Sequence, residues 1–200
     1  MLASIVPLGE RARNRRWGVT VTAYVIGSLA AGLVLGGIFG LAGGAVVGSR
    51  TASSPIILAI VAGAFVLGAA VDGGVGRLSL PTVHRQVDEA WLQRYRGWVY
   101  GVGFGFQLGL GVVTIVTTAT VYLLFALAFL SGSWRAGAAL GGAFGLVRAV
   151  PILAMVKVTT PKRLREAHRR MQGWGPGAAR AAIGVQCAVA VVAIAEAVRL

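Results

Sequence analysis

Glycine recurs at every fourth position of one long apolar stretch of this chain. The five glycines of this row are Gly32, Gly36, Gly40, Gly44 and Gly48. A helix has 3.6 residues per turn, so this spacing leaves one helix face almost without side chains. In lipid such a helix satisfies its own backbone hydrogen bonds, and its small residues let a second helix approach closely. The row therefore predicts a membrane helix with a packing seam, which either is static or lets a neighbouring element slide.

The distribution of charge supports a membrane location. The 200 residues are 56% hydrophobic and only 12% charged, with a net charge of +13. Fifteen of the nineteen Lys and Arg residues lie in three segments, 11–16, 77–96 and 157–180, between long apolar runs. This is the pattern of the positive-inside rule, and it argues against a nucleic-acid-binding surface. We therefore expect a multi-pass protein of the cell membrane (an inner membrane), with a cytoplasmic N-terminus, an extracytoplasmic C-terminus and contacts to anionic headgroups.

The apolar runs predict an all-α polytopic bundle with about five transmembrane helices. The first run, residues 18–48, is too long for a secretory signal and is expected to be retained. At 1.5 Å per residue it would extend about 46 Å, against about 30 Å of hydrocarbon, so it must tilt, project or break. The third run, 99–130, is also too long. We expect one membrane domain over residues 1–200, made of a two-helix unit (18–76), an interfacial amphipathic helix (77–97), a second two-helix unit (98–158), a basic interfacial helix (159–179) and a last span (180–200).

Two further glycine rows are expected to pack helices together. They comprise Gly101, Gly105 and Gly109 in the third run, and Gly137, Gly141 and Gly145 in the fourth. A shift of 79 residues also aligns residues 59–72 with 138–151, with a shared Gly-Ala-Phe. The two-helix units are therefore either duplicated or alike by chance, because sequence rich in alanine, glycine and valine matches itself easily.

Polar residues inside the apolar runs form the candidate intramembrane site. They are Asp72, Gln107, Thr114, Thr117, Thr118 and Arg148. A charge in the bilayer centre costs about 2.5–3.5 kcal/mol, so Arg148 needs a partner, and Asp72 is the first choice. The threonines mark the expected kink of the third run, since their hydroxyls can bond freed carbonyls. These residues either line a solute or ion path, or serve packing through a structural ion pair and intrahelical hydrogen bonds.

Catalytic and cofactor-binding groups are not evident in the sequence. No nucleophile, acid–base pair or phosphate-binding loop stands out, and His84 and His168 have no companion at ligand spacing. Cys187 is the single cysteine, so these residues cannot form an internal disulfide or a zinc-binding cysteine cluster. We therefore expect neither an enzyme nor a metal or other cofactor.

Residues 18–158 resemble a known group of membrane proteins. Long glycine-rich spans in duplicate, a polar break inside one of them and the segment GAFGLVRAVP are similar to the transmembrane domains of the CcdA/DsbD reductant conductors and to lysine-exporter-type carriers. The resemblance implies movement of electrons or small solutes across the bilayer. The reductant conductors, however, need one cysteine in each half, and neither half has one here, which contradicts thiol–disulfide transfer.

Two functions follow from the sequence. The first is a small-solute or ion carrier that works as an oligomer around the intramembrane polar residues. The alternative is a non-transporting membrane subunit or assembly factor that packs against other membrane proteins through its glycine-rich helix faces. The two differ in whether a polar cavity reaches Gln107 and Arg148.

Overall fold

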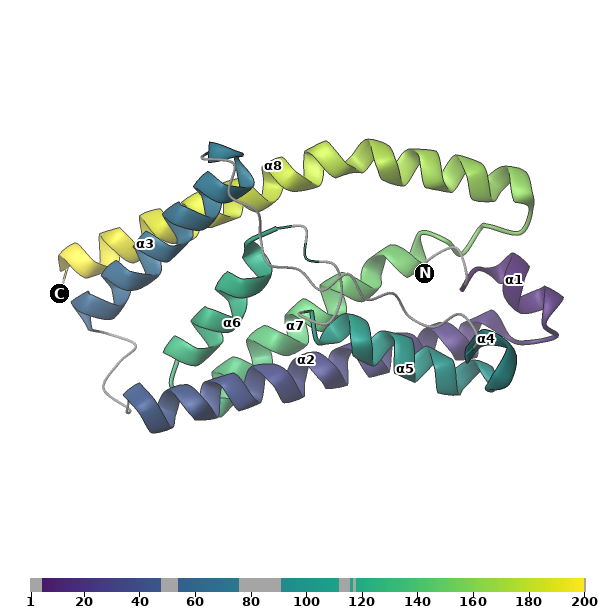
Figure 1. The fold of residues 1–200 in the computed structure, drawn as a ribbon, viewed down its shortest axis with the longest axis horizontal. Helices are drawn as coiled ribbons and strands as arrows, with labels where there is room; N and C mark the ends of the chain where they lie inside the picture. Colours follow the sequence, from purple (N-terminus) through teal and green to yellow (C-terminus); the bar gives the residue numbers. More distant parts are fainter. Residues whose placement is uncertain (1–4, 48–53, 76–90, 112–115, 117, 200) are drawn as a thin grey trace.

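The computed structural model describes residues 5–47, 54–75, 91–111, 116 and 118–199, and all regular structure within them is helical (Figure 1). The helices are α1 (Pro7–Ala12), α2 (Trp17–Val47), α3 (Pro55–Asp72), α4 (Trp91–Arg94), α5 (Gly97–Gly109), α6 (Thr120–Leu130), α7 (Trp134–Leu153) and α8 (Pro161–Arg199). Helices α2, α3, α7 and α8 are long and apolar enough to cross a membrane. This confirms the predicted all-α polytopic class.

Helix α2 packs along α7 through the predicted glycine seam. A Cβ atom added at Gly32 would lie 2.0 Å from the carbonyl oxygen of Gly141, and one added at Gly36 would lie 2.1 Å from that of Gly137. Gly40 meets Ser133 in the same way, at 2.3 Å. Side chains cannot fit at such distances, so the two backbones are in direct contact. Gly44 continues the seam against Gly132, Gly145 meets Ser28, and Gly48 lies outside the described residues.

The N-terminal half of α2 packs against α5 through the second glycine row. A Cβ added at Gly105 would approach the carbonyl oxygen of Tyr24 to 2.0 Å, and one at Gly109 would approach that of Ser28 to 2.2 Å. Gly101 faces Thr20 at 2.6 Å. Helix α2 therefore uses glycine contacts on two faces, and α2, α5 and α7 form one closely packed unit.

The third apolar run is broken where the threonines were expected to disturb it. Helix α5 ends at Gly109, Gly111 has a left-handed φ of 69°, and α6 begins only at Thr120. Glycine adopts this conformation without steric cost. By contrast, the first run is one unbroken helix of 31 residues. Of the two long runs, only the third breaks.

The basic segment and the last span form a single helix, which corrects the expected boundary near residue 180. Helix α8 has 39 residues and continues through Pro176. It begins as expected, with Pro161 in the first turn and the Thr160 hydroxyl accepting a hydrogen bond from the Arg163 amide at 3.3 Å.

The expected interfacial helix 77–97 falls largely on residues 76–90, which are not described; α4 and the start of α5 cover its end.

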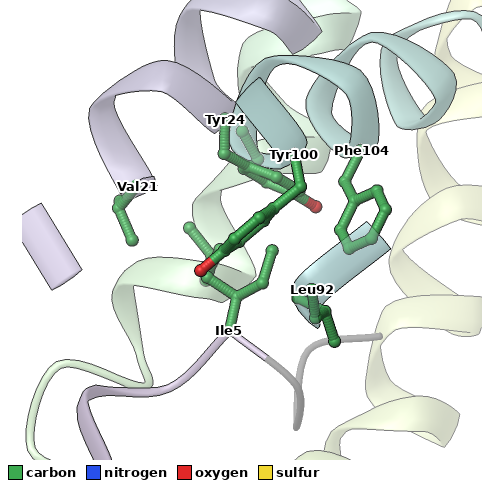
Figure 2. Packing of buried hydrophobic residues seen from close by; sticks show 8 residues of the cluster. Ile5, Val21, Tyr24, Leu92, Tyr100 and Phe104 are labelled. Atoms are coloured by element: carbon green, nitrogen blue, oxygen red, sulfur yellow. The ribbon is translucent and has the colours of Figure 1, made fainter. Parts of the chain in front are cut away.

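The bundle has two sides joined by α6. Figure 1 shows α2, α5 and α7 on one side and the α3–α8 pair on the other, with α6 between them. The basic segments at α1, α4 and the start of α8 lie at the same end of the molecule. At this end an aromatic core forms, where the side chains of Ile5, Tyr24 and Tyr100 meet (Figure 2).

Candidate functional site

A polar junction joins α3, α6 and α8 around Asp72, the last residue of α3. The Asp72 carboxylate accepts the backbone N–H of Ala119, with N···O distances of 2.8 and 3.1 Å. Ala119 immediately precedes α6, where backbone N–H groups have no partner within the helix. A carboxylate also interacts favourably with the positive end of a helix dipole. Asp72 therefore caps a helix that is distant from it in sequence.

Gln186 of α8 completes this junction. Its side chain is fully buried, and its Nε2 donates to the Asp72 carboxylate at 2.7 Å and to the Thr120 hydroxyl at 2.8 Å. Its Oε1 atom is buried and has no hydrogen-bond partner among the residues that the structure describes. Sequence reasoning missed Gln186. The available signal was an amide in the middle of the last apolar run, where an unpaired polar group is costly.

Asp72 and Arg148 have different partners, so the ion pair suggested by the sequence is not what the structure shows. The Arg148 guanidinium lies over the Phe144 ring, 5.4 Å from its centroid, as a cation–π contact on α7.

The other predicted site residues lie apart from this junction or outside the described residues. Gln107 is half-buried on α5, and the described residues show no hydrogen bond between it and the junction. Thr118 lies just before α6. Thr114 and Thr117 lie outside the described residues.

A second polar cluster, also missed from the sequence, surrounds Glu10 at the basic end. Glu10 is fully buried and accepts hydrogen bonds from the Thr20 hydroxyl at 2.7 Å, from Arg13 at 2.8 Å and from the Tyr100 hydroxyl. Gly97 leaves room for the cluster, because a Cβ there would lie 2.6 Å from the Thr20 hydroxyl oxygen. The cluster ties the N-terminal segment to α2 and α5.

These contacts keep Glu10 ionised. Burial by itself raises the pKa of the carboxyl, but the hydrogen bonds from Tyr100, Arg13 and Thr20 and the charge of Arg13 outweigh it, so the pKa lies below its usual value. The only acidic residue of the basic N-terminal segment is therefore a structural anchor at neutral pH.

The Asp72 and Glu10 carboxylates both accept hydrogen bonds from groups of the chain itself. The described residues hold no group of three or more His, Cys, Asp or Glu side chains able to bind a metal. Two surface grooves lie elsewhere: one between the end of α7 and α8, the other between α2 and α5. Neither is lined by Asp72, Gln107 or Arg148.

Apolar helices packed through glycine seams, with internal polar clusters, define a polytopic helical membrane protein. Within that class, the chain belongs to the family described as the cytochrome c biogenesis protein transmembrane region, whose model matches residues 2–186. This confirms the CcdA/DsbD part of the resemblance. The lysine-exporter part stays an expectation.

Curated relatives add a second comparison. The chain is 35% identical over 129 residues to the methylamine utilization protein MauF of Paracoccus versutus, covering 64% of this chain and 45% of the relative. It is 31% identical over 142 residues to MauF of Methylophilus methylotrophus, covering 68% and 47%. The chain thus spans about half the length of the curated relatives it matches. No solved structure matches it significantly.

Proposed function

We propose that this chain is a non-transporting membrane subunit or assembly factor that works with partner membrane proteins in the maturation of a redox protein. The family description, which names cytochrome c biogenesis, supports a role in maturation. The relatives are methylamine utilization proteins, and a role in maturing a component of that metabolism fits their name. The 200 residues contain one cysteine, so this chain does not itself carry the cysteine pair of a reductant conductor.

The observation that carries this proposal is the set of hydrogen bonds that the Asp72 carboxylate accepts. A carrier needs polar groups that face a path for its substrate. The Asp72 carboxylate instead caps α6 and accepts the Gln186 amide, and Arg148 lies over Phe144. These contacts support a structural use of the intramembrane polar residues.

The proposed contact with a partner helix lies away from the glycine row of α2. Gly32 and Gly36 of α2 face the chain's own α7, and Gly27 faces α5, so these glycines are not available to another protein. Gly63 on α3 and Gly184 on α8 have no atom within 4 Å of an added Cβ. An interior glycine is unfavourable for a helix unless something packs against it, and small residues are typical of contacts between membrane helices. We assign partner binding to these two faces.

Blue-native electrophoresis of membranes solubilised in mild detergent tests the proposal. In a strain lacking the chain, the wild-type protein is expected to restore maturation of the redox protein and to migrate in a complex larger than its 20.6 kDa. Gly184→Leu is expected to reduce both the maturation of the redox protein and the amount of the larger complex. The matched control is Val192→Leu, because Val192 lies on the same helix and is 61% exposed.

Arg148→Met distinguishes the proposal from a carrier. The subunit proposal expects this variant to accumulate, enter the complex and support maturation. Loss of maturation at unchanged protein level and unchanged complex would instead favour the carrier, since only the carrier needs this cation for flux.

A further inference from the structure

A groove of about 330 Å³ lies between the end of α7 and the first third of α8. Its floor is apolar: Met155 and Val158 are buried, and Ala167 and Met171 pack against them. The N-terminal segment is hydrogen-bonded to this floor, because the Leu8 amide donates to the Val158 carbonyl at 3.1 Å. The groove is therefore a built feature that unites three segments of the chain.

Three cations line the groove: Lys157, Arg163 and Arg170. The ion pairs among the described residues join Glu10 to Arg13 and Glu196 to Arg199, so none of the three takes part in one. The Arg163 guanidinium donates to two neutral groups, the Lys157 carbonyl at 3.2 Å and the Thr159 hydroxyl at 3.3 Å. These bonds hold the guanidinium at the groove wall, where no carboxylate of the described residues forms an ion pair with it.

One carboxylate, Glu166, also lines the groove, which leaves it with a net charge of about +2. This positive charge attracts an anionic phosphate group. Glu166 can in addition accept hydrogen bonds from hydroxyl groups of a ligand. The volume lies at the lower end of the range of small-molecule sites, about 300–1,000 Å³.

We propose that this groove binds the headgroup of an anionic glycerophospholipid of the phosphatidylglycerol class. The phosphodiester lies among Lys157, Arg163 and Arg170, and the glycerol hydroxyls donate to Glu166. The acyl chains leave over the apolar floor and Trp174, which lines the groove and is 60% exposed. Basic pockets beside membrane helices are typical sites for anionic headgroups, and tryptophan is typical of headgroup depth.

An apolar floor next to the cations favours a lipid over free phosphate. Inorganic phosphate has no apolar part to cover Met155 and Val158, whereas a phospholipid supplies the anion and the acyl chains in one molecule. The same helix that lines the groove continues as a membrane span, which places the groove at the bilayer surface.

Native mass spectrometry of the full chain in detergent tests the proposal. After delipidation, the chain is titrated with phosphatidylglycerol, phosphatidylcholine or inorganic phosphate. We expect one phosphatidylglycerol to bind at least about tenfold more tightly than phosphatidylcholine. The variant Lys157→Gln/Arg163→Gln/Arg170→Gln is expected to lose this preference. The control Lys162→Gln/Arg165→Gln/Arg169→Gln removes the same charge from positions that do not line the groove, and is expected to keep it.

Three outcomes would overturn the assignment. Equal binding of both lipids removes the headgroup preference. Equal losses of the phosphatidylglycerol preference in the two triple variants indicate that the basic helix attracts anionic lipid as a whole, without a defined site. Displacement of phosphatidylglycerol by inorganic phosphate at similar concentration identifies free phosphate as the ligand.

A second measurement leaves the three cations of the groove unchanged. Phosphatidylglycerol brominated near its headgroup is expected to quench tryptophan fluorescence more strongly than brominated phosphatidylcholine in vesicles of matched composition. This difference should vanish in Trp174→Phe. If it persists there, the bound lipid lies beside other tryptophans and the proposed site is wrong.

Discussion

The carboxylate of Asp72 accepts the backbone amide of Ala119, 47 residues later in the chain, at 2.8 and 3.1 Å. A helix N-terminus inside a membrane has no water to satisfy its amides, so a partner from another helix takes that place. Gln186 binds the same carboxylate from α8. One side chain thus connects three helices.

Removing this carboxylate should destabilise the bundle. We expect Asp72→Ala to lower the free energy of unfolding by about 1–3 kcal/mol, because the Ala119 amide and the Gln186 amide lose their acceptor. Asp72→Asn keeps one oxygen acceptor and should lose less. Thermal unfolding in detergent, followed by intrinsic fluorescence, measures both. Equal midpoints for Asp72→Ala and the wild type would show that the cap contributes nothing.

A double-mutant cycle should separate the partners of Asp72. Asp72→Ala and Gln186→Ala are expected to couple by about 0.5–3 kcal/mol, because the two side chains share a hydrogen bond. Asp72→Ala and Arg148→Met should be additive within about 0.5 kcal/mol. Strong coupling in the second cycle, with none in the first, would restore the ion pair suggested by the sequence.

The glycine seam should tolerate no side chain. Gly141→Ala places a methyl carbon where the Gly32 carbonyl oxygen lies 2.0 Å away, so α2 and α7 must separate. We expect a loss of about 1–3 kcal/mol, the usual cost of overpacking. Gly18→Ala, at an open position on α2, is the control and should be neutral or slightly stabilising. A neutral Gly141→Ala would contradict the direct backbone contact.

Stability should fall in acid because of Glu10. Its pKa is lower in the folded chain than in the unfolded chain, where glutamate has a pKa of about 4.3. The carboxylate therefore contributes stability above that value, and the contribution is lost as the pH falls through the folded-state pKa. The unfolding midpoint of the wild type should drop below about pH 4.3, and that of Glu10→Gln should be lower at neutral pH but less sensitive to acid. Glu196→Gln, at an exposed position, should follow the wild type.

Orientation in the membrane can be measured with single cysteines. In a Cys187→Ala background, Arg135→Cys lies in the first turn of α7, and Arg165→Cys lies near the start of α8. The positive-inside rule predicts that a membrane-impermeant maleimide labels the first in intact cells and the second only after permeabilisation. The reverse pattern would invert the proposed topology.

The sequence predicted the features that depend on one helix at a time. The glycine row at Gly32, Gly36 and Gly40 indicated a seam, because small residues at helical spacing always form one face. The break of the third run was expected around its threonines, whereas length alone did not predict it, because the first run is as long and is unbroken. The joining of the basic segment to the last span was missed, because Pro176 and its neighbouring glycines are typical of a helix end. In the structure the helix continues through them.

The polar junction could not be predicted in the same way. Its members lie on α3, α6 and α8, and the choice between Arg148 and Gln186 as the partner of Asp72 depends on how these helices assemble. Charge complementarity favoured Arg148. The structure instead satisfies the carboxylate with a helix N-terminus and an amide, contacts that residue type alone does not reveal.

The backbone contact of α2 with α7 also limits how this protein can evolve. Every single-residue replacement of Gly32, Gly36, Gly137 or Gly141 adds atoms where a carbonyl oxygen lies 2.0–2.2 Å from the first of them. Even the smallest replacement, alanine, would force these helices apart. Descendants of this sequence should therefore retain these four glycines while residues on the lipid-facing surface change. Glycines at the same spacing would then identify this fold in relatives whose overall sequence identity is low.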